Sequence, residues 1–120
     1  MAKTNLLQNR VEQTPIIYAY ELVGVPSHKG LLKVGYTVRD PETRVREQLN
    51  TAHVEYRIVL KRNAMRKDGS SFDDHAVHRV LRRNGVHNIE GEWFRCDLRT
   101  VERAIASVVD GQETMIERVY

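Results

Sequence analysis

Asp74 and His78 are four positions apart in a stretch whose apolar residues recur at helical spacing. That spacing places the carboxylate and the imidazole on one face of a helix predicted over 72–84, beside His75. A carboxylate with one imidazole can hold a divalent ion, whereas the histidines and the lone Cys96 lack the spacing of a zinc site. These residues therefore predict Mg²⁺ or Mn²⁺, since Mg²⁺ commonly takes one or two carboxylates and fills its other positions with water and phosphate oxygens.

The same acids also have a purely structural interpretation. With a serine at 70 or 71 as the cap, Asp73 and Asp74 stand in the first turn of the helix, where acids stabilise its amino end. Asp73 is expected to project near the apolar face, so Asp74 is the preferred ligand if the serines begin the helix. Both interpretations of these acids stay open at this stage.

Tyr18 lies in a run of Ile, Tyr and Val residues over 15–23 that predicts a strand. Its phenol is either an ordinary core side chain or a group that orients or deprotonates an attacking water. A free phenol titrates near pH ~10, so it acts as a base at neutral pH only where cations stabilise the phenolate. Lys33 and Arg44 are the available cations, which makes these three residues the candidate catalytic set.

A second strand is predicted over 31–37, and with the first it makes a hairpin with a loose connection. Because side chains alternate along a strand, Lys33 and Gly35 share one face and Tyr36 lies on the other, unless a bulge shifts the register. Tyr36 is therefore expected to pack, and Gly35 to lie where a phosphate or another backbone approaches closely.

Arg44 falls in the first turn of a helix predicted over 41–51, which Asp40 and Pro41 begin. A lone arginine is unfavourable beside the positive end of a helix, so its position there argues for a phosphate partner. Arg46 is the alternative if the register differs by a turn.

Positive charge is concentrated between residues 57 and 83, although the whole chain has a net charge of only +3. This segment holds eight Lys or Arg residues against three Asp residues, a local net charge of +5. Binding to a phosphate backbone requires such a patch, because each neutralised phosphate releases a counterion. The alternative is a solvated loop and helix face. The candidate DNA-binding residues are Arg57, Lys61, Arg62, Arg66, Lys67, Arg79 and Arg82.

The remaining patterns add a third strand, a short apolar piece and a third helix capped by an aspartate, over 54–62, 92–96 and 98–110 respectively. Hairpin strands with helices interposed favour a small α+β domain built on an antiparallel sheet. The expected domain covers 15–110, between short extensions at 1–14 and 111–120.

Composition excludes several classes of protein. The chain has 120 residues, 41% of them apolar and 29% charged, which is typical of one soluble domain. No run approaches the roughly 18 apolar residues of a spanning helix, and the amino end lacks the apolar segment of a secretory signal. We therefore expect a cytoplasmic protein with no membrane partner. A single cysteine cannot form an internal disulfide.

An ordered set of short motifs gives the chain a family resemblance. The motifs are Ile16-Ile17-Tyr18, Lys33-Val34-Gly35-Tyr36-Thr37, Arg44, a helix with Asp74 and His78, and Gly91-Glu92-Trp93-Phe94. Over residues 15–106 the chain resembles the GIY-YIG nuclease superfamily, in particular the phage- and helicase-associated branch whose second motif reads KIG and whose domain ends in EWF. The resemblance implies a three-stranded antiparallel sheet with flanking helices and metal-dependent cleavage of DNA phosphodiester bonds.

The sequence departs from the superfamily pattern in a few places. Ile16 stands where the family name has glycine, and Lys33 where it has tyrosine, so one of two expected phenols is missing. The metal-binding glutamate of the second helix has no exact match, and an aspartate at 73 or 74 stands in its place. The late asparagine of the family also has no counterpart, and Glu92 lies in that region. The expected metal site is Asp74, joined directly or through water by Glu92 or His78.

We therefore expect a GIY-YIG-like endonuclease domain that hydrolyses DNA phosphodiesters. Tyr18 is the water-positioning base, Lys33 and Arg44 stabilise phosphate charge, and Asp74 anchors the ion. The missing tyrosine and the aspartate substitution favour a rival, a nucleic-acid-binding module that has lost its chemistry. A regulatory protein-interaction domain is a third alternative. A downstream domain in a longer polypeptide is compatible with each of them.

Overall fold

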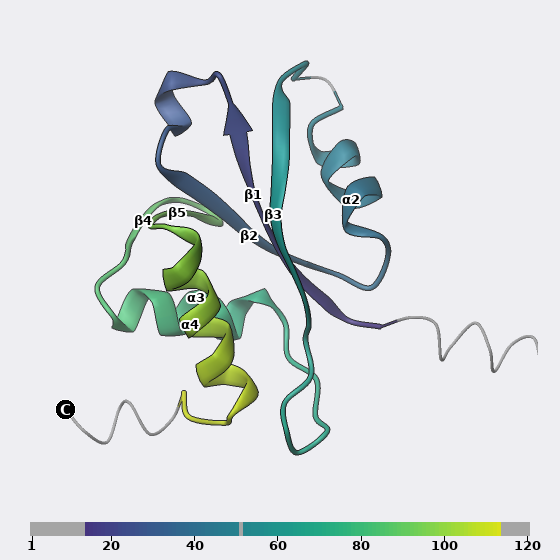
Figure 1. Cartoon of the computed structure of the whole chain (residues 1–120), viewed down its shortest axis with the longest axis vertical. Helices are drawn as coiled ribbons and strands as arrows, with labels where there is room; N and C mark the ends of the chain where they lie inside the picture. The colour runs from purple at the N-terminus through teal and green to yellow at the C-terminus, as the bar shows by residue number, and fades with distance from the viewer. Residues whose placement is uncertain (1–13, 51, 114–120) are drawn as a thin grey trace, which may run out of the picture.

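The structure is a computed structural model, and it describes residues 14–50 and 52–113. A hairpin of two strands comes first along the chain, and helices alternate with further strands after it (Figure 1). The elements are β1 Ile16–Val23, the short 3-10 helix η1 Pro26–His28, β2 Leu31–Thr37, α2 Pro41–Gln48, β3 Glu55–Asn63, α3 Asp74–Arg83, β4 His87–Glu90, β5 Trp93–Arg95 and α4 Leu98–Val109.

The five strands form one antiparallel sheet in the order β3-β1-β2-β5-β4. The prediction of a three-stranded sheet is therefore wrong, although the α+β class fits. The short apolar piece expected over 92–96 provides β5, which pairs with β2, and β4 pairs with β5 in turn. The sequence does not predict β4, because this edge strand, HNIE, has a single half-buried residue and no alternation of apolar side chains.

Different helices cover the two faces of this sheet. Ile17 and Ala19 of β1 belong to the main core, which the sheet forms with α3 and α4. Tyr18 and Tyr20 alternate with them along the strand and cluster on the opposite face with Val45 of α2. Figure 1 shows the same division, with α2 beside β3 and away from the crossed pair α3 and α4.

The register between β1 and β2 confirms which residues share a face. Tyr18 is opposite Gly35 and Tyr20 is opposite Lys33, with no shift along the paired residues. Opposed residues of antiparallel strands lie on the same face, so Lys33 and Gly35 lie beside the tyrosines, as predicted. We call this the tyrosine face. Tyr36 lies on the other face, where its half-buried side chain packs against the main core, also as predicted.

The absence of a side chain at Gly35 makes room for Tyr18. A Cβ atom at position 35 would lie 2.5 Å from Tyr18 Cζ and 2.6 Å from Tyr18 Oη, which is far inside normal packing distance. The expectation that a phosphate or another backbone approaches Gly35 is thus corrected. The close neighbour is the aromatic ring of Tyr18, a residue that is only 1% exposed.

Aspartates cap the helices on either side of the sheet. At the start of α2, Asp40 Oδ2 accepts a hydrogen bond from Thr43 N at 3.2 Å, and at the start of α4, Asp97 Oδ1 accepts one from Thr100 N at 2.9 Å. Both caps are as predicted. α2 is shorter than predicted and ends at Gln48.

α3 begins later than predicted, and its cap is an aspartate rather than a serine. Phe72 is held in the preceding loop, because its N–H donates to Ala64 O at 3.0 Å and its side chain is buried. The helix starts only after this contact, and Asp73 Oδ1 caps it by accepting from His75 N at 3.0 Å. Asp73 is exposed instead of lying near the apolar face, whereas Asp74 is only 8% exposed.

Of the extensions expected at 1–14 and 111–120, residues 1–13 and 114–120 lie outside the described residues. The described residues outside the elements at the two ends are Thr14 and Pro15 before β1 and 110–113 after α4. No helix in the described part of the chain is long and apolar enough to cross a membrane.

The contact between Tyr18 and Gly35 can be tested by Gly35→Ala. We expect this change to lower the free energy of unfolding by about 1–3 kcal/mol, because the added methyl group overpacks a buried site. In a Tyr18→Leu background, which lacks the end of the ring, the same change should cost much less. Urea denaturation of the four proteins measures this difference. An equal cost in both backgrounds would contradict the assignment of the ring as the obstructing group.

Candidate active site on the tyrosine face

Six side chains from separate parts of the chain, one of them Tyr18, come together at one place. β1 and β2 supply a tyrosine and a lysine, and α2 supplies an arginine and a glutamine. The first residue of α3 and the residue before β5 supply two acids. Their proximity shows in the hydrogen bonds and in the charges that act on Tyr18 and Glu92. We call the group the tyrosine site, and it consists of Tyr18, Lys33, Arg44, Gln48, Asp74 and Glu92.

α2 presents two polar side chains to the tyrosines. Arg44 and Gln48 are four residues apart and therefore on one side of the helix. Gln48 Oε1 accepts hydrogen bonds from Tyr18 Oη at 3.5 Å and from Tyr20 Oη at 3.4 Å. The Arg44 guanidinium stays 43% exposed and lies 3.9 Å from Glu47, so its charge remains accessible to a bound anion.

Burial and charge act in opposite directions on the phenol of Tyr18. Burial raises its pKa above the ordinary value of 10.0, and the negative charge of Glu92 raises the pKa further. The charge of Arg44 and hydrogen bonds with Gln48 and Arg44 lower the pKa, but burial outweighs them. At neutral pH the phenol is therefore protonated and serves as a hydrogen-bond donor.

Asp74 and Glu92 bring two carboxylates together in a partly desolvated position. Burial is the largest cause of the raised pKa of Glu92. The negative charge of Asp74 and a hydrogen bond with Asp74 raise this pKa further. Lys33, and after it His75, offset part of this repulsion. Burial and the charge of Asp74 together outweigh these cations, so the ionised form of Glu92 is disfavoured.

A single residue of β2 holds both acids in place. Val34 N–H donates to Glu92 O at 3.0 Å, and Val34 O accepts from His78 Nε2 at 2.8 Å. His78 is 3% exposed, and burial lowers the pKa of its imidazole. Because His78 lies one turn after Asp74, its bond to β2 fixes the first turn of α3 beside Glu92.

The donor set suits a hard divalent cation. Asp74 and His75 have ligand atoms within 4.8 Å of one another, and Glu92 adds a second carboxylate next to Asp74. Asp73 lies within the same distance, but its carboxylate caps α3. Such a cation would neutralise the repulsion between the acids, and carboxylate oxygens are the ligands that Mg²⁺ and Mn²⁺ favour. The residues present therefore fit the expected ion.

The structure brings most of the predicted site residues together. Tyr18, Lys33, Arg44, Asp74 and Glu92 all belong to the tyrosine site. The Nε2 atom of His78, which the sequence suggests as an alternative to Glu92 beside Asp74, is bonded to Val34 O and lies 3.9 Å from Asp74 Oδ2. It is Arg44, not the alternative Arg46, that acts on Tyr18.

Gln48 is the residue that the sequence reasoning missed. Its position could have indicated this role, because it follows Arg44 by four residues in a predicted helix and therefore lies on the same side of that helix. His75 also acts on Glu92, although the sequence singles it out only as a neighbour of Asp74.

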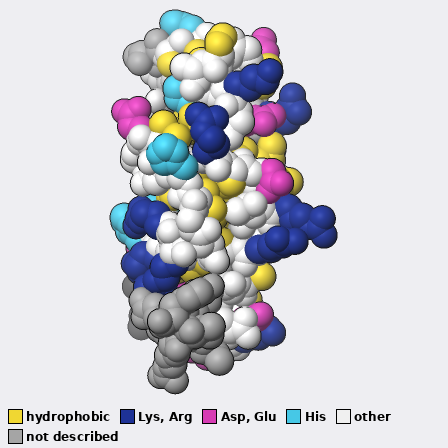
Figure 2. All heavy atoms as spheres, turned by 90° about the vertical axis from the view of Figure 1, so that its left-hand side faces the viewer, with side chains coloured by type: hydrophobic (Ala, Val, Ile, Leu, Met, Phe, Trp, Pro, Cys, Tyr) yellow, Lys and Arg dark blue, Asp and Glu magenta, His cyan; other side chains and the backbone are white. Residues whose placement is uncertain are grey.

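In the folded chain, some cations of the basic segment 57–83 are paired with acids and others are not. Four of its seven predicted DNA-binding residues form ion pairs, namely Arg57 with Glu21 at 3.5 Å, Arg62 with Glu102 at 2.9 Å, Arg66 with Glu113 at 2.9 Å and Lys67 with Asp110 at 2.7 Å. Within the described residues, Lys61, Arg79 and Arg82 have no such partner. Figure 2 shows one side of the molecule, on which Lys and Arg side chains stand among acids and histidines rather than in one block.

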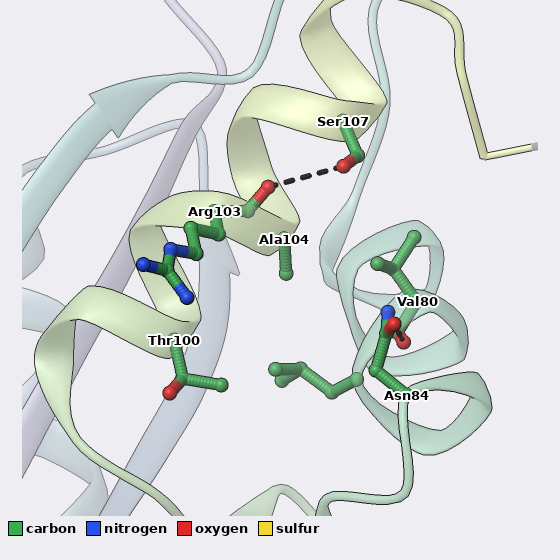
Figure 3. A pocket seen from close by; sticks show the side chains of 7 residues that line it. Val80, Asn84, Thr100, Arg103, Ala104 and Ser107 are labelled. Carbon is green, nitrogen blue, oxygen red and sulfur yellow. Dashed lines mark hydrogen bonds between the residues drawn. The ribbon is translucent and has the colours of Figure 1, made fainter. Parts of the chain in front are cut away.

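A groove between α3 and α4 is a separate feature of the surface (Figure 3). It lies on the face of the sheet opposite Tyr18, and its polar groups are bonded within the helices: Asn84 Nδ2 donates to Val80 O, and Ser107 Oγ donates to Arg103 O. None of the described residues that line it has a carboxylate, an imidazole or a thiol. The groove therefore lacks the metal ligands that the tyrosine site has.

One family model matches most of the described chain. Residues 16–109 match the T5orf172 domain, a span that includes every residue of the tyrosine site. No curated protein and no solved structure matches the chain.

The crowding of the two acids predicts a gain in stability for Glu92→Gln. The raised pKa of Glu92 means that the folded state favours its protonated form, so ionisation destabilises the fold as pH rises from the ordinary carboxyl range through the raised pKa. We expect a higher Tm than wild type at pH 7 without divalent ions, and a difference that vanishes at acid pH. Glu90→Gln, at an exposed position two residues away, is the control. A Tm difference that does not depend on pH would contradict the charge repulsion.

Proposed function

The chain belongs to the T5orf172 domain family, a phage-associated nuclease-like family, and from this membership we propose that it is a metal-dependent endonuclease domain of the GIY-YIG type that hydrolyses DNA phosphodiester bonds. The observation that carries the proposal is the meeting of a buried phenol, a partly exposed arginine and two crowded carboxylates at one place. Phosphodiester hydrolysis needs these groups: one that handles the proton of water, cations for the phosphate and acids for a metal ion.

In the proposed reaction, a water oxygen attacks phosphorus and the bond from phosphorus to the leaving sugar oxygen breaks. Tyr18 orients the water and, in its phenolate form, takes up the proton of the water. In the protonated form, Gln48 holds the phenol in position by accepting its hydrogen bond. Arg44, whose guanidinium is partly exposed next to the phenol, stabilises the negative charge that grows on the phosphate oxygens.

Asp74 and Glu92 would hold Mg²⁺ or Mn²⁺. When bound, the ion would add positive charge beside the phosphate and make the leaving oxygen easier to expel. It would also offset the charge of Glu92, which raises the pKa of Tyr18 in the structure described here.

Lys33 occupies the place at which the superfamily pattern has its second tyrosine. It is opposite Tyr20 in the sheet, and its Nζ atom lies 5.8 Å from the centre of the Tyr20 ring. A lysine here contributes charge instead of a second phenol, so its proposed role is to attract the phosphate and to partly neutralise Glu92.

A DNA-binding module without catalysis is the second candidate. The observation that favours it is the raised pKa of Tyr18, which keeps the phenol protonated at neutral pH. Such a module would bind DNA at the same surface and cleave none, so cleavage assays separate the two candidates.

Asp74→Asn against Asp73→Asn is the central test of the metal role. The two changes are chemically identical and adjacent, but Asp73 is the exposed cap of α3, a role that asparagine fills equally well, whereas Asp74 lies in the tyrosine site. We expect Asp74→Asn to abolish Mg²⁺- or Mn²⁺-dependent nicking of plasmid DNA, and Asp73→Asn to retain it. Thermal melts with added Mn²⁺ give a second readout, because a bound ion stabilises the fold of wild type but not of Asp74→Asn. Retained nicking by Asp74→Asn would contradict the proposal.

Tyr18→Phe and Tyr36→Phe form a second matched pair. Each removes one hydroxyl, but the two side chains lie on opposite faces of the sheet. We expect Tyr18→Phe to abolish cleavage with DNA affinity kept, and Tyr36→Phe to cleave like wild type.

The pH profile of wild type tests the proton-accepting role of Tyr18. Because the pKa of Tyr18 is raised above 10.0, the reactive phenolate fraction is small at pH 7 and grows with pH. The single-turnover rate should therefore rise by about tenfold per pH unit between roughly pH 7 and 9. A flat profile would mean that Tyr18 only orients the water.

A further inference from the structure

Lys61 lies on the tyrosine face, next to Tyr18. In the antiparallel pairing of β1 with β3, Lys61 is directly opposite Tyr18, while its neighbour Arg62 is opposite Ile17 of the main core. Opposed residues share a face, so Lys61, Tyr18 and Gly35 form one row across three strands. The shift in the β1–β3 register falls after this row, between Ala19 and Tyr20.

Lys61 also lines an open hollow of about 530 Å³ beside the start of α2. The other charged groups in this hollow have partners. Arg39 is 2.6 Å from Glu47, and the Asp40 carboxylate accepts from the backbone N–H and the hydroxyl of Thr43, both at 3.2 Å. Within the part of the chain that the structure describes, Lys61 is the charged lining residue whose side chain has no ion pair or hydrogen bond. The complete lining is Thr14, Ile16, Val38, Arg39, Asp40, Pro41, Lys61 and Asn63.

The neighbouring cations of β3 are in a different situation. Arg57 and Arg62, on the other side of the strand, pair with Glu21 and Glu102. A cation that is paired with a carboxylate either loses that ion pair when it binds a phosphate or keeps the negative charge close to the phosphate. Its contact with the phosphate therefore contributes less binding free energy. Among the basic residues of β3, Lys61 is therefore the best placed to bind an added anion.

We propose that this hollow binds a backbone phosphate adjacent to the one that is cleaved, with Lys61 as its cation, so that the DNA strand runs from the tyrosine site past the start of α2 to the edge strand β3. The inference rests on the proposed function, because it takes the tyrosine site as the place of cleavage. It gives the basic segment a direction: from the tyrosine site, the nucleic-acid strand leads toward Lys61 on the edge strand β3. The ligand class is the sugar-phosphate backbone, which carries no sequence information.

The test measures the salt dependence of binding to a fluorescent 20-base-pair duplex in Ca²⁺, for wild type and single variants. Losing one phosphate contact lowers the slope of log affinity against log salt by about 0.9. We expect Lys61→Ala to lower the slope by that amount and Lys61→Arg to restore it. Arg62→Ala should lower it by clearly less. Arg99→Ala, on α4, controls for loss of one exposed charge elsewhere on the chain.

Cleavage kinetics give the second readout. Lys61→Ala should raise KM and leave kcat close to wild type, because Lys61 lies beside the reacting group and not at it. An unchanged slope for Lys61→Ala would overturn the assignment of Lys61 as a phosphate ligand, and so would an equal decrease in slope for Lys61→Ala and Arg62→Ala. In either case, cleavage by wild type would still support the proposed function. A wild-type protein that binds the duplex with a Lys61-dependent slope but never cleaves would overturn the proposed function and uphold Lys61 as a phosphate ligand.

Discussion

The packing of the Tyr18 ring over Gly35 is the constraint on which the rest of the structure depends. It fixes β1 against β2 in one register, since a slip by one residue would place a side chain where the ring lies and would turn the tyrosines toward the main core. With that register set, the sheet has an apolar face for α3 and α4 and a second face on which polar groups surround a phenol. Strand geometry thus determines which side chains can share a site.

The electrostatics of the site oppose stability in the absence of a cation. Glu92 faces Asp74 where burial favours its neutral form, and the phenol of Tyr18 beside them is kept protonated. The fold tolerates this because backbone hydrogen bonds, not the acids themselves, hold the segments in place. Perturbed groups of this kind cluster at functional sites, since chemistry requires charges that a purely structural surface would avoid.

Local patterns predict a large part of this molecule from its sequence. Alternation over 31–37 was enough to separate Lys33 from Tyr36, and Asp40 and Asp97 could be recognised as caps from their positions before helical runs. What could not be predicted depends on contacts distant in the chain. The bond from Phe72 to Ala64 decides where α3 begins, and so transfers the capping role to Asp73. Arg62 finds Glu102 forty residues away, which no count of charges along the chain reveals. The edge strand β4 is defined by its pairing rather than by its own composition.

The two main-chain hydrogen bonds of Val34 also limit the ways in which this sequence can vary. Its amide holds the segment that carries Glu92, and its carbonyl holds the helix that carries Asp74. Both are main-chain groups, which every residue except proline provides in full. Position 34 can therefore change to other β-branched residues that fill the same core space without moving the acids. An insertion or deletion between Lys33 and Gly35 would instead separate the acids from the phenol. In related chains, the length of this segment should be kept more strictly than the identity of its middle residue.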